Sequence, residues 1–500
     1  MTRLRFAPSP TGFVHVGNAR TALFNFLHAR RQEGKMVLRI EDTDVERSKK
    51  EYEENLIKDL KWLGLQWDEG PDVGGDFGPY RQSERVEIYR KYARQLVDSG
   101  HAYYCFCSPE ELQKEKETAV DKDSTAGYSG KCRQLDSEES KKRVQAGEEA
   151  AIRFKIPKDT SIVFFDLVRD KVTFDANLLP DPVILRSTGI PAYNFSVVID
   201  DHLMQISLVI RGEDHLSNTA RQVLIYEALG FEKPKFAHLS MVMGADNTKL
   251  SKRHGSTSLL QFREQGYLPQ ALFNYLALLG WSPGGDTEVV LTKPQLIEKF
   301  NLKKVTKSAA IFDYQKLKWL NREHIRRLAD KELGEMMVPF MRQAGFDFEE
   351  NAETIDWIGN AAKILSNYSY LLSEIAGDFK QFVTSDISAE IIGNIKNSEN
   401  ASKVISTLFT EISKISSPVE FEKVAEITKK IQLETGIKGK ELYHPIRLAL
   451  TGKDSGIELK DFIPLIEKGS VLGIKPAVQN MVSRLKVLAT EDRGCVNHDH

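Results

Sequence analysis

The sequence predicts an α/β fold in which a doubly wound parallel sheet is split by an insertion and followed by an all-helical region. Strand-like and helix-like segments alternate over the first hundred residues, short β-like runs gather at 151–186, and helical periodicity dominates from about Leu317. Because 500 residues exceed what one hydrophobic core holds, we expect several domains.

The first hundred residues predict the first half of the sheet. Residues 3–7 form a short strand that ends in a Pro-Ser-Pro-Thr-Gly loop. The elements expected next are a helix over 18–32, a strand over 36–40, and helices marked by apolar residues between 52 and 63 and between 86 and 96. Alternation of this kind is typical of parallel, doubly wound sheets.

The later segments define the expected domains. Residues 108–150 are charged and loop-rich, β-like runs follow at 151–156, 161–165 and 182–186, and a strand and a helix resume at 206–228. We therefore expect a first half of the α/β domain over 1–107 and a second half over 191–316, with an inserted domain at 108–190. An all-helical region over 317–490 and a polar tail over 491–500 complete the chain.

Composition limits the class of protein. The chain is 41% hydrophobic and 28% charged with a formal net charge of -2, and it contains four cysteines. No apolar run is long enough to span a bilayer, the N-terminus lacks a secretory apolar region, and four cysteines do not make a disulfide scaffold. These features predict a cytoplasmic protein, and any nucleic-acid surface must be a local basic patch.

The loop after the first strand is the first candidate ligand site. Pro8 and Pro10 stiffen it, while Gly12 and Gly17 allow a ligand to approach the backbone. His15 is placed to donate to a phosphate oxygen at the start of a helix, where anions are favoured. The alternative is a tight strand-to-helix turn that carries a surface histidine.

A second candidate lies far downstream, at Lys249-Leu-Ser-Lys-Arg253. Lys249 and Lys252 are flexible point charges suited to the phosphates of a nucleoside triphosphate. Alone, the segment also fits a solvated basic loop. In this order, the two motifs predict one nucleotide site assembled from both halves of the sheet.

With these motifs in place, the chain resembles class I aminoacyl-tRNA synthetases, specifically the bacterial-type glutamyl-tRNA synthetases. Residues 6–12 with His15-Val-Gly-Asn18 resemble the "HIGH" signature, and Lys249–Arg253 resembles the "KMSKS" loop. Two departures are visible, since Asn18 replaces a histidine and Arg253 replaces a serine. Collinear motifs at 39–44, 78–83, 198–202, 210–214, 312–313 and 316–317 extend the resemblance from Thr2 to about Gly452.

The resemblance implies ATP-dependent attachment of glutamate to tRNA(Glu) through an enzyme-bound adenylate, with Mg²⁺ accompanying ATP. His15, Lys249 and Lys252 would be the catalytic residues, acting by positioning and charge stabilisation. The ATP contacts implied are His15, Gly17, Asp214, Val242, Lys249, Lys252 and Arg253.

The resemblance also implies a glutamate pocket. Arg211 would bind the side-chain carboxylate, with Arg5 as a second cation, and Glu41 would face the substrate ammonium. An exposed surface ion pair is the alternative for Arg5 and Glu41. The glutamate contacts implied are Arg5, Ala7, Ser9, Glu41, Tyr193 and Arg211.

Three of the four cysteines lie in or beside the insertion. Some members of the family bind zinc with a Cys-x-Cys … Cys pattern, which the resemblance assigns here to Cys105, Cys107 and Cys132. Gln134 stands where a histidine ligand would be, so Tyr128 becomes the fourth candidate, although tyrosine is an unusual zinc ligand. Ordinary buried thiols are the alternative. Cys495, in the tail, is expected to be an incidental thiol.

The helical region is expected to contact the tRNA. Basic residues between Lys303 and Arg327 would contact phosphates, or form a solvated face. Lys438, Lys440 and Arg447 are further candidates. The resemblance predicts a monomer that charges tRNA(Glu), and leaves open whether it also charges tRNA(Gln).

Three other functions compete with this reading. They are glutamylation of a modified tRNA base by a truncated relative, transfer of a nucleotide to a small acid without tRNA, and a catalytically inactive RNA-binding adaptor. The long helical region argues against the first, and the intact His15, Lys249, Lys252, Arg211 and Glu41 argue against the third.

Overall fold

The computed structural model describes residues 1–44, 47–118, 128–285, 289–384, 387–416 and 418–489. The expected tail at 491–500, with Cys495, lies outside these residues. The chain forms two compact units, an N-terminal one of residues 1–262 and 269–314 and a C-terminal one of residues 263–268 and 315–500. No helix in the described ranges is both long and apolar enough to cross a membrane.

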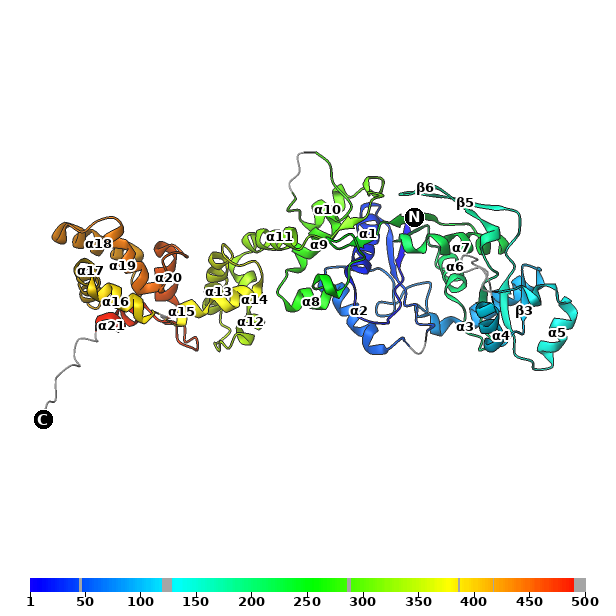
Figure 1. The fold of residues 1–500 in the computed structure, drawn as a ribbon, viewed down its shortest axis with the longest axis horizontal. Helices are drawn as coiled ribbons and strands as arrows, with labels where there is room; N and C mark the ends of the chain where they lie inside the picture. The colour runs from blue at the N-terminus through cyan, green and yellow to red at the C-terminus, as the bar shows by residue number, and fades with distance from the viewer. Residues whose placement is uncertain (45–46, 119–127, 286–288, 385–386, 417, 490–500) are drawn as a thin grey trace. The chain divides into compact units, whose positions relative to one another are not determined.

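Parallel strands form the centre of the N-terminal unit (Figure 1). Strand β1 (Arg3–Phe6) pairs in parallel with β2 (Lys35–Leu38), and β8 (Leu208–Gly212) pairs in parallel with β9 (Lys235–Leu239). The backbone N–H of Ser207 donates to the carbonyl of Arg3 at 3.0 Å, which places the start of β8 beside β1. The carboxyl ends of β1, β8 and β9 therefore lie together.

Helices pack on these strands in two groups. In the first, Phe24 and Phe26 of α1 (Val16–Arg31) make edge contacts with Phe300 and with Phe273 of α9 (Pro269–Leu278). The second group shares a continuous core with β8 and β9. It consists of α3 (Val86–Asp98), α6 (Tyr193–Leu203) and α7 (Leu216–Ala228).

Five further elements of this unit lie outside the inserted segment. They are α2 (Lys50–Trp62), β10 (Val242–Met243), α8 (Leu259–Glu264), α10 (Lys293–Lys299) and β11 (Ala310–Ile311), which pairs in parallel with β10. α8 ends two residues beyond the part of the chain assigned to this unit.

The inserted segment and the residues just before it contribute antiparallel strands. β3 (Ala102–Cys105), β4 (Ala151–Phe154) and β7 (Val183–Leu185) form one sheet, and β5 (Ser161–Asp166) pairs with β6 (Asp170–Asp175) as a hairpin. At its end, β5 joins the parallel strands, because Asp166 lies in register with Phe236 of β9.

The expectation that 108–150 is mainly loop is wrong for two stretches of this segment. α4 (Pro109–Thr118) and α5 (Ser137–Gln145) lie there. In α5 only Ser140 is buried, so the helix carries no apolar stripe that periodicity could detect. It is defined instead by its ends, where the Asp136 side chain accepts the N–H of Glu139 and basic residues occupy the last turn.

The C-terminal unit is helical, as expected. Trp357, Phe379, Phe382 and Phe462 form its aromatic core, and the Trp357 Nε1–H donates to the Leu465 carbonyl at 2.9 Å. Its helices are most of α11 (Tyr314–Arg327), then α12 (Asp330–Gln343), α13 (Ala352–Leu365), α14 (Leu372–Asp378), α15 (Lys380–Val383), α16 (Ala389–Asn397), α17 (Glu399–Ile412), α18 (Phe421–Thr435), α19 (Lys440–Thr451), α20 (Leu459–Gly469) and α21 (Met481–Ala489).

Candidate active site

A cavity of about 490 Å³ opens at the carboxyl ends of β1, β8 and β9. Open α/β sheets bind their ligands at this edge, and the volume is in the range of about 300–1,000 Å³ that small-molecule sites occupy. Eleven of the residues expected from the sequence line it, namely Arg5, Ala7, Ser9, His15, Gly17, Glu41, Tyr193, Arg211, Asp214, Val242 and Lys249.

His15 is fixed at the start of α1. It is the N-cap residue, and its Nδ1 accepts the backbone N–H of Gly17 at 3.3 Å. Because Nδ1 is the acceptor in this bond, the proton of a neutral imidazole lies on Nε2. Burial, and secondly the charge of Lys249, lower the pKa of His15, so the ring is neutral at physiological pH. His15 thus lines the cavity as a neutral hydrogen-bond donor.

Gly17 leaves room for a ligand beside this donor. If Gly17 carried a Cβ, the nearest protein atom other than its chain neighbours and its own helix backbone would be the His15 Nδ1, at 3.8 Å. Packing within the protein therefore leaves open space beside Gly17, which a ligand can approach.

The lysine loop borders the other side of the cavity. Val242 and Leu250 are joined by a backbone hydrogen bond of 3.1 Å, which closes the hairpin that presents Lys249. The His254 Nδ1 accepts the backbone N–H of Ser251 at 3.0 Å. Arg253 pairs with Asp246 at 3.2 Å, and it does not line the cavity. The side chain of Lys252 lies outside those that the structure describes.

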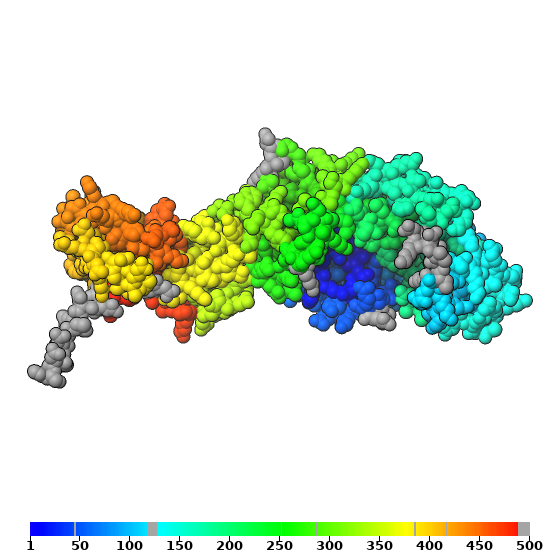
Figure 2. Space-filling model, viewed as in Figure 1, coloured from blue at the N-terminus to red at the C-terminus, as the bar shows by residue number. Residues whose placement is uncertain are grey.

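The two motifs are joined through the backbone. The N–H of Val16 donates to the Thr257 carbonyl at 2.9 Å, and the N–H of Leu259 donates to the Val14 carbonyl at 3.0 Å. In the space-filling view, the N-terminal segment (blue) and the segment near residue 250 (green) lie side by side (Figure 2). The histidine motif and the chain that follows the lysine loop are therefore held as one assembly.

Arg5 and Glu41 belong to a buried ion network, which rules out the alternative of an exposed surface pair. Arg5 is 4% exposed, and Glu41 is 5% exposed. The Arg5 Nε donates to Asp201 at 3.1 Å, and Arg39 donates to Asp201 at 2.7 Å and to Glu41 at 3.1 Å. Asp201 and Arg39 therefore hold both residues at the cavity.

Asp200 joins this network through Arg39, whose Nε lies 3.7 Å from it. It accepts from the Arg85 Nε at 2.7 Å, from Gln82 at 2.8 Å and from the Tyr89 hydroxyl at 2.8 Å. Asp200 and Asp201 lie in the C-terminal half of α6, where the helix dipole disfavours carboxylates. The arginines around them compensate for this and for their burial.

Burial has a marked effect on Glu41. It raises the pKa of Glu41 to about 7, against the opposing influence of Arg39 and Arg5. The carboxylate therefore changes its charge near neutral pH, and a cation placed against it would favour the charged form.

Arg211 is a buried cation whose hydrogen bonds within the described residues all go to neutral groups. Its Nε donates to His238 at 3.3 Å, and its Nη2 donates to Thr219 at 2.6 Å and to Gln222 at 2.7 Å. Among the described residues, the one hydrogen-bond acceptor of the Arg211 Nη1 is the Tyr193 hydroxyl, at 3.5 Å. In the part of the chain that the structure describes, no carboxylate forms an ion pair with Arg211. A buried, unpaired guanidinium that lines a cavity is a site for an anionic group.

Tyr193 lies beside Arg211 in a neutral network. Its hydroxyl is 3.1 Å from the His215 Nδ1, which is also 3.2 Å from the Asn218 side chain. Burial, and secondly Arg211, lower the pKa of His215 to about 4, so this histidine is uncharged. The hydrogen-bonded network of Tyr193, His215 and Asn218 beside Arg211 therefore consists of uncharged side chains.

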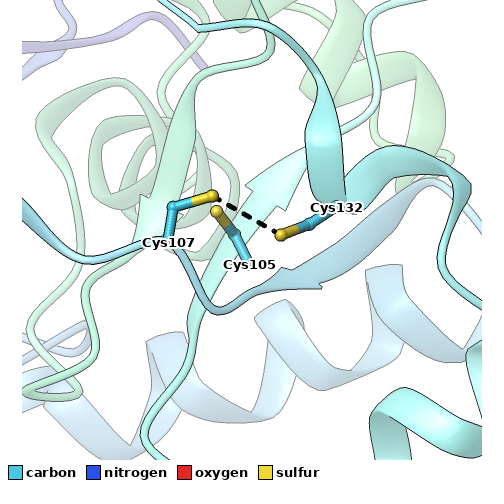
Figure 3. Close-up of side chains that lie close together, drawn as sticks. All are labelled: Cys105, Cys107 and Cys132. Carbon is cyan, nitrogen blue, oxygen red and sulfur yellow. Dashed lines mark hydrogen bonds between the residues drawn. The ribbon is translucent and has the colours of Figure 1, made fainter. Parts of the chain in front are cut away.

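Three thiols meet in the inserted segment (Figure 3). Ligand atoms of Cys105, Cys107 and Cys132 all lie within 4.8 Å of one another, and the Tyr128 hydroxyl is 3.6 Å from the Cys105 Sγ. The Arg153 Nε donates to Cys105 at 3.3 Å, and its guanidinium lies 3.8 Å from the Tyr128 ring centre. The four predicted ligand side chains are brought together, with a cation beside them.

Several residues of the site were missed in the sequence. Asp201, His238 and Gln222 had no role assigned, although each contacts a predicted site residue. One signal was available, because Asp200-Asp201 interrupts an apolar helix, and buried carboxylates require cationic partners. His238 and Gln222 carry no such local signal.

Comparison with protein families gives two matches. Residues 1–319 match tRNA synthetases class I (E and Q), catalytic domain, and residues 332–473 match an anticodon binding domain. The fold class expected from the sequence is therefore confirmed.

Individual relatives agree with these families. The chain is 48% identical to a glutamate–tRNA ligase of Sulfurihydrogenibium over 93% of this chain and 96% of that protein. It is 47% identical to glutamate–tRNA ligase 1 of Caldicellulosiruptor saccharolyticus, over 94% and 97% of the two chains. The crystal structure of a glutamate tRNA ligase from Elizabethkingia meningosepticum superposes with a TM-score of 0.85 at 32% identity, covering 98% and 99%. The chain belongs to the glutamate–tRNA ligase family of class I tRNA synthetases.

Proposed function

We propose that this enzyme joins L-glutamate to the 3′-terminal adenosine of tRNA(Glu), consuming ATP and releasing AMP and pyrophosphate. The observation that carries the choice of amino acid is Arg211, a buried guanidinium without an anionic partner among the described residues. A side-chain carboxylate would supply the missing charge. The neutral amide of glutamine would leave the guanidinium without a counter-charge. The free-energy cost of burying that charge would then be uncompensated.

In the first step, an oxygen of the glutamate α-carboxylate bonds to the α-phosphorus of ATP, and the bond to pyrophosphate breaks. His15 Nε2–H would donate to a phosphate oxygen, and Lys249 and Lys252 would stabilise the charge that develops on the phosphates. No protein nucleophile is required, because orientation of the two substrates supplies the catalysis. We assign Gly17, Asp214, Val242 and Arg253 to the ATP site.

Mg²⁺ would enter with ATP. Among the described residues, only the three cysteines form a cluster of at least three metal-binding side chains, so the cavity holds no carboxylate cage. The phosphate oxygens would thus be the main ligands of Mg²⁺, which would neutralise part of their charge.

The amino acid would be held at both ends. Arg211 would bind the γ-carboxylate through its Nη1 edge, and Glu41 would pair with the ammonium. Asp201 accepts a hydrogen bond from the Nε of Arg5, and the terminal nitrogens of Arg5 are left for a contact with the substrate. Ala7, Ser9 and Tyr193 would complete the pocket.

In the second step, the 2′-hydroxyl of the terminal adenosine would attack the adenylate carbonyl, and AMP would leave. We assign residues 1–107 and 191–316 to the catalytic domain, 108–190 to binding of the acceptor stem, and 317–490 to the anticodon arm. Charging of tRNA(Gln) remains a second possible activity of the same site. We propose that the enzyme acts as a cytoplasmic monomer.

We propose a structural zinc ion at Cys105, Cys107 and Cys132, with Tyr128 as the fourth ligand. The Cys107 and Cys132 sulfurs are 3.6 Å apart, a separation compatible with two sulfurs that each lie about 2.3 Å from one tetrahedral zinc ion. Arg153 would offset the negative charge of a thiolate-rich site.

Aminoacylation with radiolabelled amino acids tests the function. The enzyme, ATP and unfractionated tRNA are incubated with glutamate, glutamine or aspartate in parallel. Charging with glutamate alone is the expected result. No charging by protein that still binds ATP would overturn the proposal, and purified tRNA(Glu) and tRNA(Gln) then define the tRNA substrate.

A further inference from the structure

His238 connects the glutamate pocket to the β5–β6 hairpin. Its side chain is fully buried on β9, between Asp166 at the end of β5 and Arg211 at the end of β8. The His238 Nδ1 lies 2.6 Å from the Asp166 Oδ2. Its Nε2 accepts the Arg211 Nε–H at 3.3 Å and lies 2.8 Å from the Thr219 hydroxyl.

These contacts define which nitrogen of the His238 ring carries the proton. The Arg211 Nε is always a donor, so the His238 Nε2 must be an acceptor and the ring proton lies on Nδ1. That proton points to Asp166, which accepts it. The Thr219 hydroxyl accepts from the Arg211 Nη2, and its own proton has two acceptors within reach, the His238 Nε2 at 2.8 Å and the His215 carbonyl at 3.1 Å. Burial is the main cause that lowers the pKa of His238, which favours the neutral ring that this arrangement requires.

We propose that Asp166 and His238 are positioning residues that hold Arg211 in the orientation that selects glutamate. This inference rests on the proposed function, because it assumes that Arg211 binds the substrate carboxylate. Asp166 sets the tautomer of His238, His238 holds the Nε edge of Arg211, and the opposite edge then faces the cavity. The inserted segment thereby contributes to amino-acid selection through β5.

Asp166→Asn separates this role from a structural one. The Asp166 Oδ1 accepts the backbone N–H groups of Val168 at 2.9 Å, Arg169 at 2.7 Å and His238 at 3.2 Å. An asparagine keeps its carbonyl oxygen in that position, which leaves its NH₂ group facing the His238 Nδ1. The ring proton must then move to Nε2, where it opposes the Arg211 Nε–H.

The experiment measures steady-state aminoacylation by the full-length enzyme, with glutamate and ATP varied separately. For Asp166→Asn, we expect KM for glutamate to rise about 10- to 100-fold, which is the range for loss of a hydrogen bond to a charged group. KM for ATP and the melting temperature should stay unchanged. Asp170→Asn is the matched control, because it makes the same chemical change at an exposed side chain directly opposite Asp166 in the same hairpin. An unchanged KM for glutamate in folded Asp166→Asn would overturn the proposal.

Two substitutions of His238 provide an independent readout. His238→Gln places a carbonyl oxygen near the position of Nε2 and retains an acceptor for Arg211, whereas His238→Asn reaches only the position of Nδ1. We expect the glutamine variant to keep a KM for glutamate close to wild type and the asparagine variant to show the increase. Equal KM values in the two variants would contradict the proposal even if Asp166→Asn fails to fold.

Arg211→Ala separates failure of this inference from failure of the proposed function. If Arg211→Ala leaves KM for glutamate unchanged, the pocket itself is misassigned. If Arg211→Ala raises KM for glutamate and Asp166→Asn does not, the pocket stands and only the positioning role fails.

Discussion

The Nδ1 atom of His15 accepts the backbone N–H of Gly17 at 3.3 Å, and this bond orients the imidazole at the cavity. It occurs at the N-cap of α1, so the bond that starts the helix also assigns the imidazole proton to Nε2. Asn18, which replaces the second histidine of the family motif, is exposed and does not contribute to this bond. The proposed donation to the ATP phosphates therefore involves one imidazole of this motif.

Replacing His15 tests that role. His15→Ala is expected to lower kcat about 100-fold, the effect of removing one preorganised donor, with little change in KM for glutamate. His15→Gln carries an amide N–H near the position of Nε2 and should recover most of the rate. Single-turnover formation of the adenylate in the presence of tRNA is the measurement. A glutamine variant as slow as the alanine variant would argue against donation from Nε2.

Glu41 predicts a pH dependence for glutamate binding. Its pKa is raised to about 7, mainly by burial, so the group is increasingly protonated below that pH. A protonated Glu41 cannot pair with the substrate ammonium, so KM for glutamate should fall from about pH 6 to about pH 8 and then level off. Steady-state kinetics across this range measure it. Glu41→Gln should have a higher KM without this dependence, and the same pH slope in that variant would assign it to another group.

Asp200 should contribute strongly to stability. Asp200→Ala leaves Arg85 buried without its carboxylate and removes one of the three carboxylates around Arg39, and loss of one partner of a buried ion pair typically costs about 3–5 kcal/mol. Urea unfolding followed by a probe in the N-terminal unit measures the loss. Glu87→Ala is the control, because that side chain is 80% exposed and pairs only at the surface with Arg90. Equal midpoints for the two variants would contradict a stabilising role for the network.

The cysteine cluster predicts one zinc ion per chain. Cys132→Ser should abolish the zinc and lower the melting temperature, because metal binding stabilises the folded segment. Cys495→Ser is the matched control and should retain the metal. Elemental analysis of the purified proteins is the measurement, and a zinc content near zero in the unaltered enzyme would contradict the assignment.

The sequence predicted the parts of the fold that depend on local pattern. The alternation of apolar residues located β1, α3 and α7, and motif spacing brought His15 and Lys249 to one cavity. α1 begins at Val16, two residues earlier than expected, because His15 caps the helix with its own side chain. A capping histidine has no distinctive local pattern.

The contacts that hold the site could not be predicted in this way. Arg5 and Asp201 are 196 residues apart, and His238 and Asp166 are 72 apart, so strand order and register decide these pairs. Resemblance to a family identified Arg211 as a substrate contact. Only the structure shows that its neighbours Thr219, Gln222 and His238 are all neutral acceptors.

Amino-acid discrimination by an Arg211 variant is the most direct test of the account. The measurement is the ratio of kcat/KM for glutamate to kcat/KM for glutamine, in the unaltered enzyme and in Arg211→Ala. We predict a ratio of about 10⁴ or more for the unaltered enzyme, since a buried charged group rejects a substrate that leaves it unpaired. In Arg211→Ala the ratio should fall at least 100-fold, about 2.7 kcal/mol, while ATP still binds. A ratio that Arg211→Ala leaves unchanged would contradict the claim that this guanidinium selects glutamate.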